Sequence, residues 1–507
     1  MSNTSLRSAF LSLWLACSVS SIVVEAAEPD WRVPLSGQTD LGDRVVVEGT
    51  WDGQAFKPRL ARIEPSAADK PALTPLPLEA PLLQRMVPTV FGGEERASLA
   101  MLGDRVVLTC QAGTRPAGLV LEAGERLPHG AAIEMHLDTQ AKAGFAIGIG
   151  PARRDPVTTS PLPPDGRVAI NGLPGDIGLR ITLLCPDAGG MLALTDLRLA
   201  STAQPPRPPR SGWAWRPALW RDEPQRLIDA AKTLRLAELF VAVEIDAKAG
   251  LVAEERFAAF VTQAREAAIS VIVVEGDAAM ALPAGRDLAL QRLRHLAAYQ
   301  DAAAPAGRLA GLQYDIEPYL LPDFGHAPEM VMRGWAETIT ALRSQAPVAL
   351  DVVLPFWLMS DEHALRHVMP ALARGADSIT IMAYRTKPQA IVAAAEPLLA
   401  WAGRAGRRAR IALENGPLPD ETHRVYQRRT GGELRIERDS EGRFFAVLDP
   451  GGREGARFGF SHEIAVPAAN VSFLGDRARL DSVAALVEPL LAAWPAFAGI
   501  ALHGVIE

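Results

Sequence analysis

The chain has 507 residues, of which 48% are hydrophobic and 22% charged, and its formal net charge is -7. This length is too great for one ordinary hydrophobic core, so we expect two or three globular domains. The negative balance, without a basic stripe of interleaved aromatic residues, argues against a nucleic-acid partner.

Residues 1–27 have the pattern of a signal peptide. Arg7 precedes an apolar run, and Ala26 and Ala27 offer a cleavage site. Serines interrupt the run, which favours cleavage over a spanning helix, and no other stretch is long and apolar enough to cross a bilayer. Lipid attachment at Cys17 is the alternative. We therefore expect a periplasmic or secreted protein with no integral membrane segment after signal removal.

Residues 28–201 alternate short β-like runs with Gly, Pro and Asp turn signals, which predicts an all-β sandwich of the jelly-roll type. Cys110 and Cys185 lie in two of these runs. In an exported protein two such cysteines suggest a disulfide, and two buried free thiols are the alternative. A carbohydrate-binding module and a packing domain both fit this region. Residues 202–211 have the composition of a stiff Pro-rich linker.

From residue 212 the hydrophobic pattern changes, and apolar runs alternate with helical patterns. Eight candidate strands and seven helices extend to residue 507, which predicts an α/β fold of the (β/α)8 barrel type. The strands are expected to begin at Gly212, Leu239, Ser270, Gly311, Ala349, Ser378, Ala409 and Gly499. An insertion at about 420–470 has the pattern of a β-hairpin on the catalytic face, where it would line a substrate cleft.

The stretch Leu309–Pro322 carries the strongest chemical signal. Asp315 and Glu317 are two residues apart, so a strand places both on one face, and Pro318 ends the ladder directly afterwards. The carboxyl ends of barrel strands are where such folds do chemistry. Paired carboxylates are the minimum for glycoside hydrolysis, in which one must stay protonated near neutral pH.

Other polar and aromatic residues follow the predicted strands and are candidates for substrate binding. They are Gln313, Tyr319, Trp215, Asp351, Trp357, Arg385 and His503. Asp351 could instead be a buried, hydrogen-bonded acid, and Asp315 could be a structural acid paired with Arg385. We find no HExxH or zinc spacing, no phosphate-binding glycine loop and no GxSxG elbow, so we expect neither a metal nor a cofactor.

The fourth predicted strand resembles a family signature. GLQYDIEPY is similar to the D-G-x-D-x-D-x-E motif of family 18 glycoside hydrolases, the chitinase-like enzymes. Gly311, Asp315 and Glu317 match the motif, whereas Ala310 and Gln313 replace its first two aspartates. The resemblance implies that Glu317 is the general acid and that Asp315 orients an N-acetyl group of the substrate as internal nucleophile.

The sixth predicted strand, ITIMAYRT, resembles the M-x-Y-D motif of the same family. Met382 and Tyr384 match, and Arg385 stands where the family has Asp. The resemblance implies that Tyr384 donates a hydrogen bond to the substrate. The replaced aspartates suggest a divergent member that hydrolyses a polysaccharide other than chitin.

Two further hypotheses remain open. In the first, Glu317 and Glu414 are the acid/base and nucleophile of a clan-A-like retaining glycosidase, with carboxyl groups about 5–5.5 Å apart. In the second, the barrel has lost catalysis and binds carbohydrate, for example in exopolysaccharide export.

Overall fold

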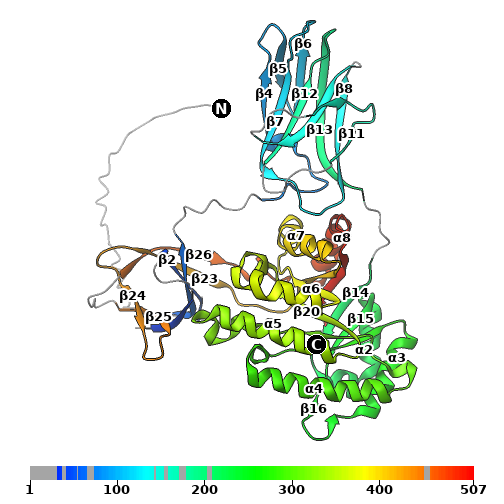
Figure 1. Cartoon of the computed structure of the whole chain (residues 1–507), viewed down its shortest axis with the longest axis vertical. Helices are drawn as coiled ribbons and strands as arrows, with labels where there is room; N and C mark the ends of the chain where they lie inside the picture. Colours follow the sequence, from blue (N-terminus) through cyan, green and yellow to red (C-terminus); the bar gives the residue numbers. More distant parts are fainter. Residues whose placement is uncertain are drawn as a thin grey trace, which may run out of the picture.

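The computed structural model describes residues 31–36, 42–53, 55–65, 74–141, 144–152, 158–170, 178–202, 208–449 and 457–506. The expected signal peptide, Cys17 and the centre of the Pro-rich linker lie outside these residues. The described chain forms three bodies, a large barrel, a two-sheet domain and a small β-barrel (Figure 1).

The large barrel is a closed ring of eight parallel strands in chain order. The strands are β14 (Arg210–Ala214), β15 (Leu236–Ala242), β18 (Ser270–Glu275), β19 (Gly311–Tyr314), β20 (Ala349–Pro355), β21 (Ser378–Met382), β22 (Arg408–Glu414) and β27 (Phe497–His503). Every strand expected from the apolar runs is present, and their order confirms the predicted (β/α)8 barrel.

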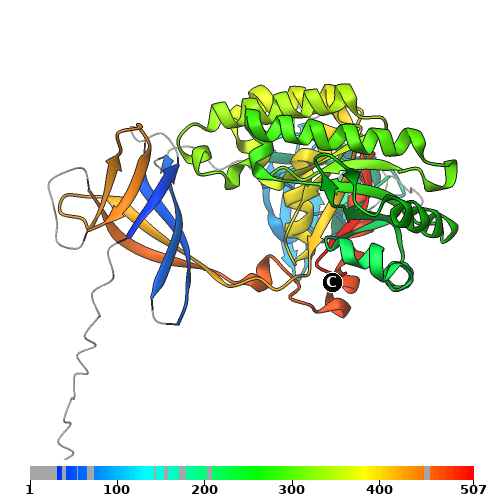
Figure 2. The ribbon, with the colours of Figure 1, turned by 90° about the horizontal axis from the view of Figure 1, so that it is seen from below.

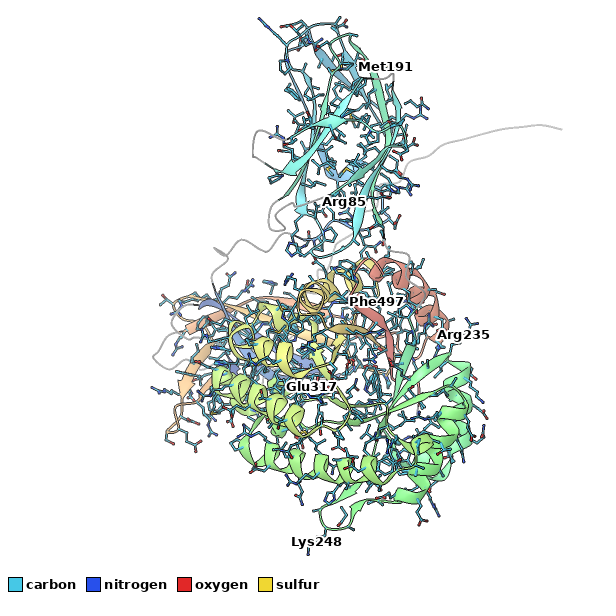
Figure 3. All side chains as sticks on the ribbon, turned by 45° about the vertical axis from the view of Figure 1, so that its right-hand side comes forward. Arg85, Met191, Arg235, Lys248, Glu317 and Phe497 are labelled. Carbon is cyan, nitrogen blue, oxygen red and sulfur yellow. A yellow bond between two sulfur atoms is a disulfide. The ribbon has the colours of Figure 1, made fainter. Side chains whose placement is uncertain are left out.

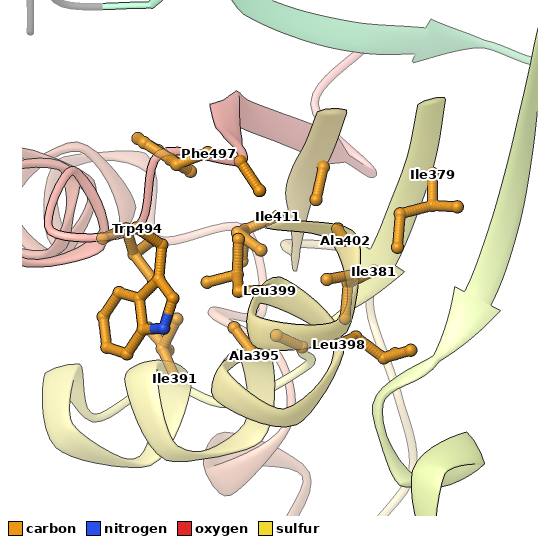
Figure 4. Packing of buried hydrophobic residues seen from close by; sticks show 14 of the residues in the cluster. Ile379, Ile381, Ile391, Ala395, Leu398, Leu399, Ala402, Ile411, Trp494 and Phe497 are labelled. Atoms are coloured by element: carbon orange, nitrogen blue, oxygen red, sulfur yellow. The ribbon is translucent and has the colours of Figure 1, made fainter. Parts of the chain in front are cut away.

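Helices cover the outside of the ring. They are α1 (Pro217–Asp222), α2 (Pro224–Thr233), α3 (Glu254–Glu266), α4 (Pro283–Ala302), α5 (Pro328–Gln345), α6 (Met369–Gly375), α7 (Pro388–Arg404) and α8 (Arg477–Leu491), with a short hairpin of β16 (Ile245–Asp246) and β17 (Gly250–Leu251). Figure 4 shows the packing: Leu398 and Leu399 of α7 lie against Ile381 and Ile411 of the strands. Among the described helices, none has the length and apolar character needed to cross a membrane.

The two-sheet domain comprises two antiparallel five-stranded sheets. One contains β10 (Ser160–Pro161), β9 (Ala146–Pro151), β12 (Gly178–Leu184), β7 (Gly118–Arg126) and β4 (Met86–Phe91), and the other contains β11 (Arg167–Ala169), β8 (Ile133–Ala141), β13 (Gly190–Ser201), β6 (Arg105–Cys110) and β5 (Ala97–Leu102). The expected disulfide is present: Cys110 ends β6, Cys185 follows β12, and their Cα atoms lie 5.8 Å apart. It links the two sheets.

The small barrel corrects the expected division of the chain. Strands β1 (Trp31–Ser36), β2 (Gly42–Trp51) and β3 (Phe56–Pro65) do not join the two-sheet domain. They close a seven-stranded barrel with four strands of the insertion. These are β23 (Glu421–Arg428), β24 (Leu434–Arg438), β25 (Phe444–Leu448) and β26 (Arg457–Val466). The insertion is therefore half of a domain rather than a lone hairpin, because its strands need partners to bury their apolar faces.

Specific contacts hold the three bodies together. Arg126 of the two-sheet domain donates to both oxygens of Glu396 on α7, at 2.5 and 2.6 Å, and Glu396 is 1% exposed. Trp494 donates its indole N–H to the His129 carbonyl at 2.7 Å. Figure 2 shows β23 and β26 running from the large barrel to the small one. Between these two barrels, the backbone N–H of Phe444 in the small barrel donates to Nδ1 of His326, which precedes α5 of the large barrel, at 3.2 Å.

Candidate active site

Asp315 and Glu317 lie directly beyond the carboxyl end of β19, where the sequence placed them. The Asp315 backbone N–H donates to the carbonyl of Glu275 on the neighbouring strand, at 2.8 Å, so the chain is still held by the sheet at this point. Glu317 then precedes a short 3-10 helix, Pro318–Leu320. Figure 3 labels Glu317 within the large barrel.

Glu317 is oriented by aromatic neighbours. The Tyr319 hydroxyl donates to Oε1 of Glu317. The Tyr319 ring in turn contacts the Trp357 ring edge-on, with centroids 5.2 Å apart. Burial, followed by the charge of Glu317, raises the pKa of Tyr319, so the phenol keeps its proton and remains a donor. Three sequence-predicted residues thus form one connected group.

One oxygen of the Asp315 carboxyl has no hydrogen-bond partner among the described residues. Its Oδ1 is buried and accepts no hydrogen bond within the described chain. Burial, then the negative charge of Glu317, raises the pKa of Asp315 from 3.8 to about 7, although nearby His503 opposes the shift. No ion pair joins Asp315 to Arg385 among the described residues, so the structural alternative for Asp315 finds no support. A buried oxygen of this kind is costly unless a ligand satisfies it.

Tyr384 reaches the same place from the end of β21. Burial, followed by the charges of Glu414, Asp315 and Glu317, raises the pKa of Tyr384 well above its ordinary value. Its hydroxyl makes no hydrogen bond to another described residue, and its ring centroid lies 6.2 Å from that of His503. The protonated phenol of Tyr384 thus retains an O–H donor that no described residue uses.

A chain of hydrogen bonds, here called the relay, joins residues at the ends of three strands, namely Trp215, His503 and Glu414. The Trp215 indole donates to Nε2 of His503 at 2.8 Å, and Nδ1 of His503 lies 2.6 Å from Oε2 of Glu414. Because an indole can only donate, Nε2 of His503 is the acceptor for Trp215, and Nδ1 is the nitrogen that faces Glu414. The Gly416 amide donates to Oε1 of Glu414 at 2.5 Å.

Both oxygens of Glu414 are therefore engaged, and its side chain is buried. Burial acts to raise the pKa of Glu414, but the His503 contact and backbone amides outweigh it and hold the pKa below its ordinary value. Gly504 has a φ of +65°, and a Cβ there would collide with the Gly416 amide nitrogen. A glycine at 504 is thus required for this backbone amide to reach the carboxylate.

Asp351 lies inside the barrel rather than at its mouth. It is 4% exposed, its Oδ1 accepts from Ser378 and Arg410 at 2.5 and 3.1 Å, and its Oδ2 accepts from Gln313 and Thr380 at 2.8 and 2.7 Å. Gln313 also accepts from the Trp213 indole at 2.7 Å. We therefore correct the assignment of Asp351 and Gln313 from substrate binding to support of the barrel interior.

Sequence reasoning missed part of this interior network. Arg410 donates to Asp351 and, at 2.8 and 2.9 Å, to both oxygens of Glu238. The available signal was strand alternation, since Ser378 and Thr380 are polar residues two apart on a barrel strand. The network spans the barrel below the site and fixes the strands that carry Asp315 and Tyr384.

Arg385 extends from the rim next to Tyr384. Its Nη1 donates to the Tyr384 carbonyl at 2.7 Å, and its Cζ lies 4.4 Å from the centroid of the Phe356 ring. The described residues contain no group of three or more His, Cys, Asp or Glu side chains that could hold a metal ion. The site combines the carboxyl groups of Asp315 and Glu317, the phenols of Tyr319 and Tyr384, the relay and aromatic rings.

No protein-family model matches the chain, and no curated protein matches it in sequence. Among solved structures it is similar to the spore cortex-lytic enzyme SleL of Bacillus cereus, at 12% identity over 61% of this chain and 73% of that one, with a TM-score of 0.34. It is also similar to the GH18 chitinase of Cycas revoluta in complex with (GlcNAc)3, at 12% identity over 59% and 95%, with a TM-score of 0.32.

A family 1 β-glucosidase from Thermotoga maritima is a further similar structure, at 10% identity over 60% of this chain and 88% of that one, with a TM-score of 0.34. The similar structures thus include the family that the two sequence motifs resemble. At such low identities and TM-scores the likeness does not decide the activity, which has to be argued from the residues of this chain.

Proposed function

We propose that the chain is a glycoside hydrolase that cleaves a polysaccharide, with Glu317 as general acid and Asp315 assisting. The observation that carries this proposal is Oδ1 of Asp315, which is buried without a hydrogen bond from any described residue, two residues before Glu317 at the carboxyl end of a strand of a (β/α)8 barrel. A pKa of about 7 leaves this group able to hold or lose a proton under ordinary conditions.

In the substrate-assisted form of the reaction, an N-acetyl amide of the substrate donates its N–H to Oδ1 of Asp315. The acetyl oxygen attacks the anomeric carbon while the glycosidic C–O bond breaks, and Glu317 gives its proton to the leaving oxygen. Tyr384 donates a hydrogen bond to the acetyl oxygen. Water then opens the cyclic intermediate, and Glu317 takes back a proton from that water.

In this mechanism Glu414 holds His503 in position and is not the nucleophile. Its two oxygens are held by His503 and by the Gly416 amide, so attack on a sugar would require both contacts to break. A paired comparison separates the two mechanisms. Substrate assistance requires the N-acetyl group, so an N-deacetylated oligosaccharide should not be cleaved, whereas a Glu414 nucleophile would tolerate its loss.

The test of the catalytic assignment is Glu317→Gln, measured on N-acetylated oligosaccharides. We expect turnover to fall by about 10²–10⁴-fold with binding retained, as for loss of a general acid. Glu244→Gln is the matched control, because Glu244 also follows a barrel strand but is exposed and paired with Arg221. Full activity in the Glu317 variant would refute the assignment, and binding without turnover by the unmodified protein would favour the non-catalytic hypothesis.

We also propose that the protein is exported, with residues 1–27 removed. The disulfide between Cys110 and Cys185 supports this, because such bonds persist in oxidising compartments. Amino-terminal sequencing of the protein from cell fractions is the test. A mature terminus near residue 28 in the periplasm or medium is expected, and a reduced, uncleaved chain in the cytoplasm would contradict the proposal.

A further inference from the structure

Arg385 is a rigidly held arginine on the rim of the candidate site. Tyr384, which precedes it, points toward His503, and Thr386, which follows it, donates its hydroxyl to the Ala469 carbonyl at 2.6 Å. The backbone is thus fixed on both sides of Arg385. The guanidinium itself is tied back to the Tyr384 carbonyl.

The guanidinium also stacks on an aromatic face. Its Cζ lies 4.4 Å from the Phe356 ring centroid, a distance at which a cation and an aromatic ring attract each other. Phe356 adjoins Trp357, whose ring contacts Tyr319, the residue that donates to Glu317. Two consecutive residues of one segment therefore contact Arg385 and, through Tyr319, the proposed general acid.

The charge of Arg385 has no counter-ion in the part of the chain that the structure describes. Among the described residues it forms no ion pair, although the chain contains many arginine–carboxylate pairs elsewhere. Burial lowers the pKa of Arg385 from its ordinary value, and no carboxylate acts against that effect. The guanidinium remains charged and has five N–H donors, of which one is used by the protein. A half-buried, unpaired charge of this kind is unfavourable unless a ligand neutralises it.

We propose that Arg385 binds a carboxylate carried by a sugar unit next to the cleavage position, so that the substrate is an acidic, uronate-containing polysaccharide. This inference rests on the proposed glycosidase function. The planar fork of an arginine matches the two oxygens of a carboxylate, and the contact with Phe356 restricts the position of the guanidinium. The inference also gives a physical reason for an arginine at a position where the family motif has an acid.

The experiment measures binding by calorimetry with the full chain and three hexasaccharides. One alternates N-acetylglucosamine with glucuronic acid, the second is its methyl ester, and the third is the neutral N-acetylglucosamine hexamer. Glu317→Gln is used if turnover occurs during the titration. We expect the acidic form to bind about 10–100-fold more tightly than its ester, the range of a charged hydrogen-bonded pair.

Variants locate this preference. Arg385→Gln should abolish it, and Arg385→Lys should keep only part of it, because a lysine retains the charge but loses the fork. Lys387→Gln is the matched control, since it removes one exposed positive charge two residues away. Equal binding of acid and ester, no binding of the acidic form, or an unchanged preference in Arg385→Gln would overturn the inference. Tighter binding of a sulfated analogue would overturn the carboxylate assignment.

These readouts are independent of catalysis. If Glu317→Gln stays active while the acid preference depends on Arg385, the proposed mechanism fails and the carboxylate site stands. If turnover is lost in Glu317→Gln but acid and ester bind equally, the hydrolase stands and the acidic substrate fails. Circular dichroism of each variant establishes that it is folded.

Discussion

Asp315→Asn tests the electrostatics of the site. The pKa of Asp315 rises from 3.8 to about 7 because burial and the Glu317 charge disfavour its ionised form. One pKa unit corresponds to about 1.4 kcal/mol, so ionised Asp315 lowers the free energy of unfolding by about 4 kcal/mol. That is a large part of the roughly 5–15 kcal/mol by which domains are stable.

The direction in which stability changes with pH follows from the protons that the folded and unfolded states bind. Between about pH 4 and pH 7 the folded protein binds the Asp315 proton and the unfolded chain has lost it, so stability falls as pH rises through this window. An asparagine has the same shape and no charge. The variant should match the unmodified protein at about pH 4 and exceed its Tm by several degrees at about pH 8, while losing activity.

Differential scanning calorimetry across this pH range is the assay, and Asp222→Asn is the control because the Asp222 side chain is 49% exposed. The control should show no pH-dependent gain, since exposed pairs contribute little. A Tm difference that is constant with pH, or a loss of stability at high pH, would refute the reasoning that Asp315 is buried beside a like charge.

Three other changes test separate features. Trp215→Phe keeps an aromatic face but removes the indole N–H from the relay. We therefore expect kcat/KM to fall about tenfold and its pH profile to shift. An unchanged pH profile would contradict a role for the relay. Asp351→Ala leaves Arg410 short of a buried partner and should cost about 3–5 kcal/mol in urea unfolding; a loss below about 1 kcal/mol would show that the network is dispensable. Cys110→Ser opens a loop that the bond to Cys185 closes across a separation of 75 residues, which should lower the free energy of unfolding of the two-sheet domain by about 4 kcal/mol. Chemical reduction should lower it equally. No loss of stability by either route would contradict this prediction.

The features that the sequence predicted well are local ones. Each barrel strand has its own apolar run and its own flanking helix, and the spacing of Asp315, Glu317 and Pro318 places the acids at a strand end without any knowledge of the neighbours. Contacts between segments that are distant in sequence could not be predicted in this way. Glu414 and His503 were each singled out, but their pairing depends on the closure of the ring by its last strand.

The depth of a polar residue in the barrel was also hidden from the sequence. Asp351 looked like a site residue because it is an acid on a barrel strand. It lies at the third position of β20, among hydroxyl and guanidinium donors from two other strands, and four residues before the strand ends. Alternation gives the face of a strand but not the layer at which a side chain meets its partners.

The small barrel imposes an order on folding. Strands β1–β3 emerge first from the ribosome, yet their partners begin at Glu421, after the two-sheet domain and seven of the eight strands of the large barrel have been made. At a synthesis rate of about 5–20 residues per second, the first strands wait roughly 20–70 s with unpaired edges. Strands β23–β26 thus join the first described strands to an insertion in the large barrel by non-covalent strand pairing. A fragment that lacks residues 31–65 would leave the insertion without its partners, and cutting the chain at the two-sheet domain to isolate the large barrel would produce an aggregation-prone protein.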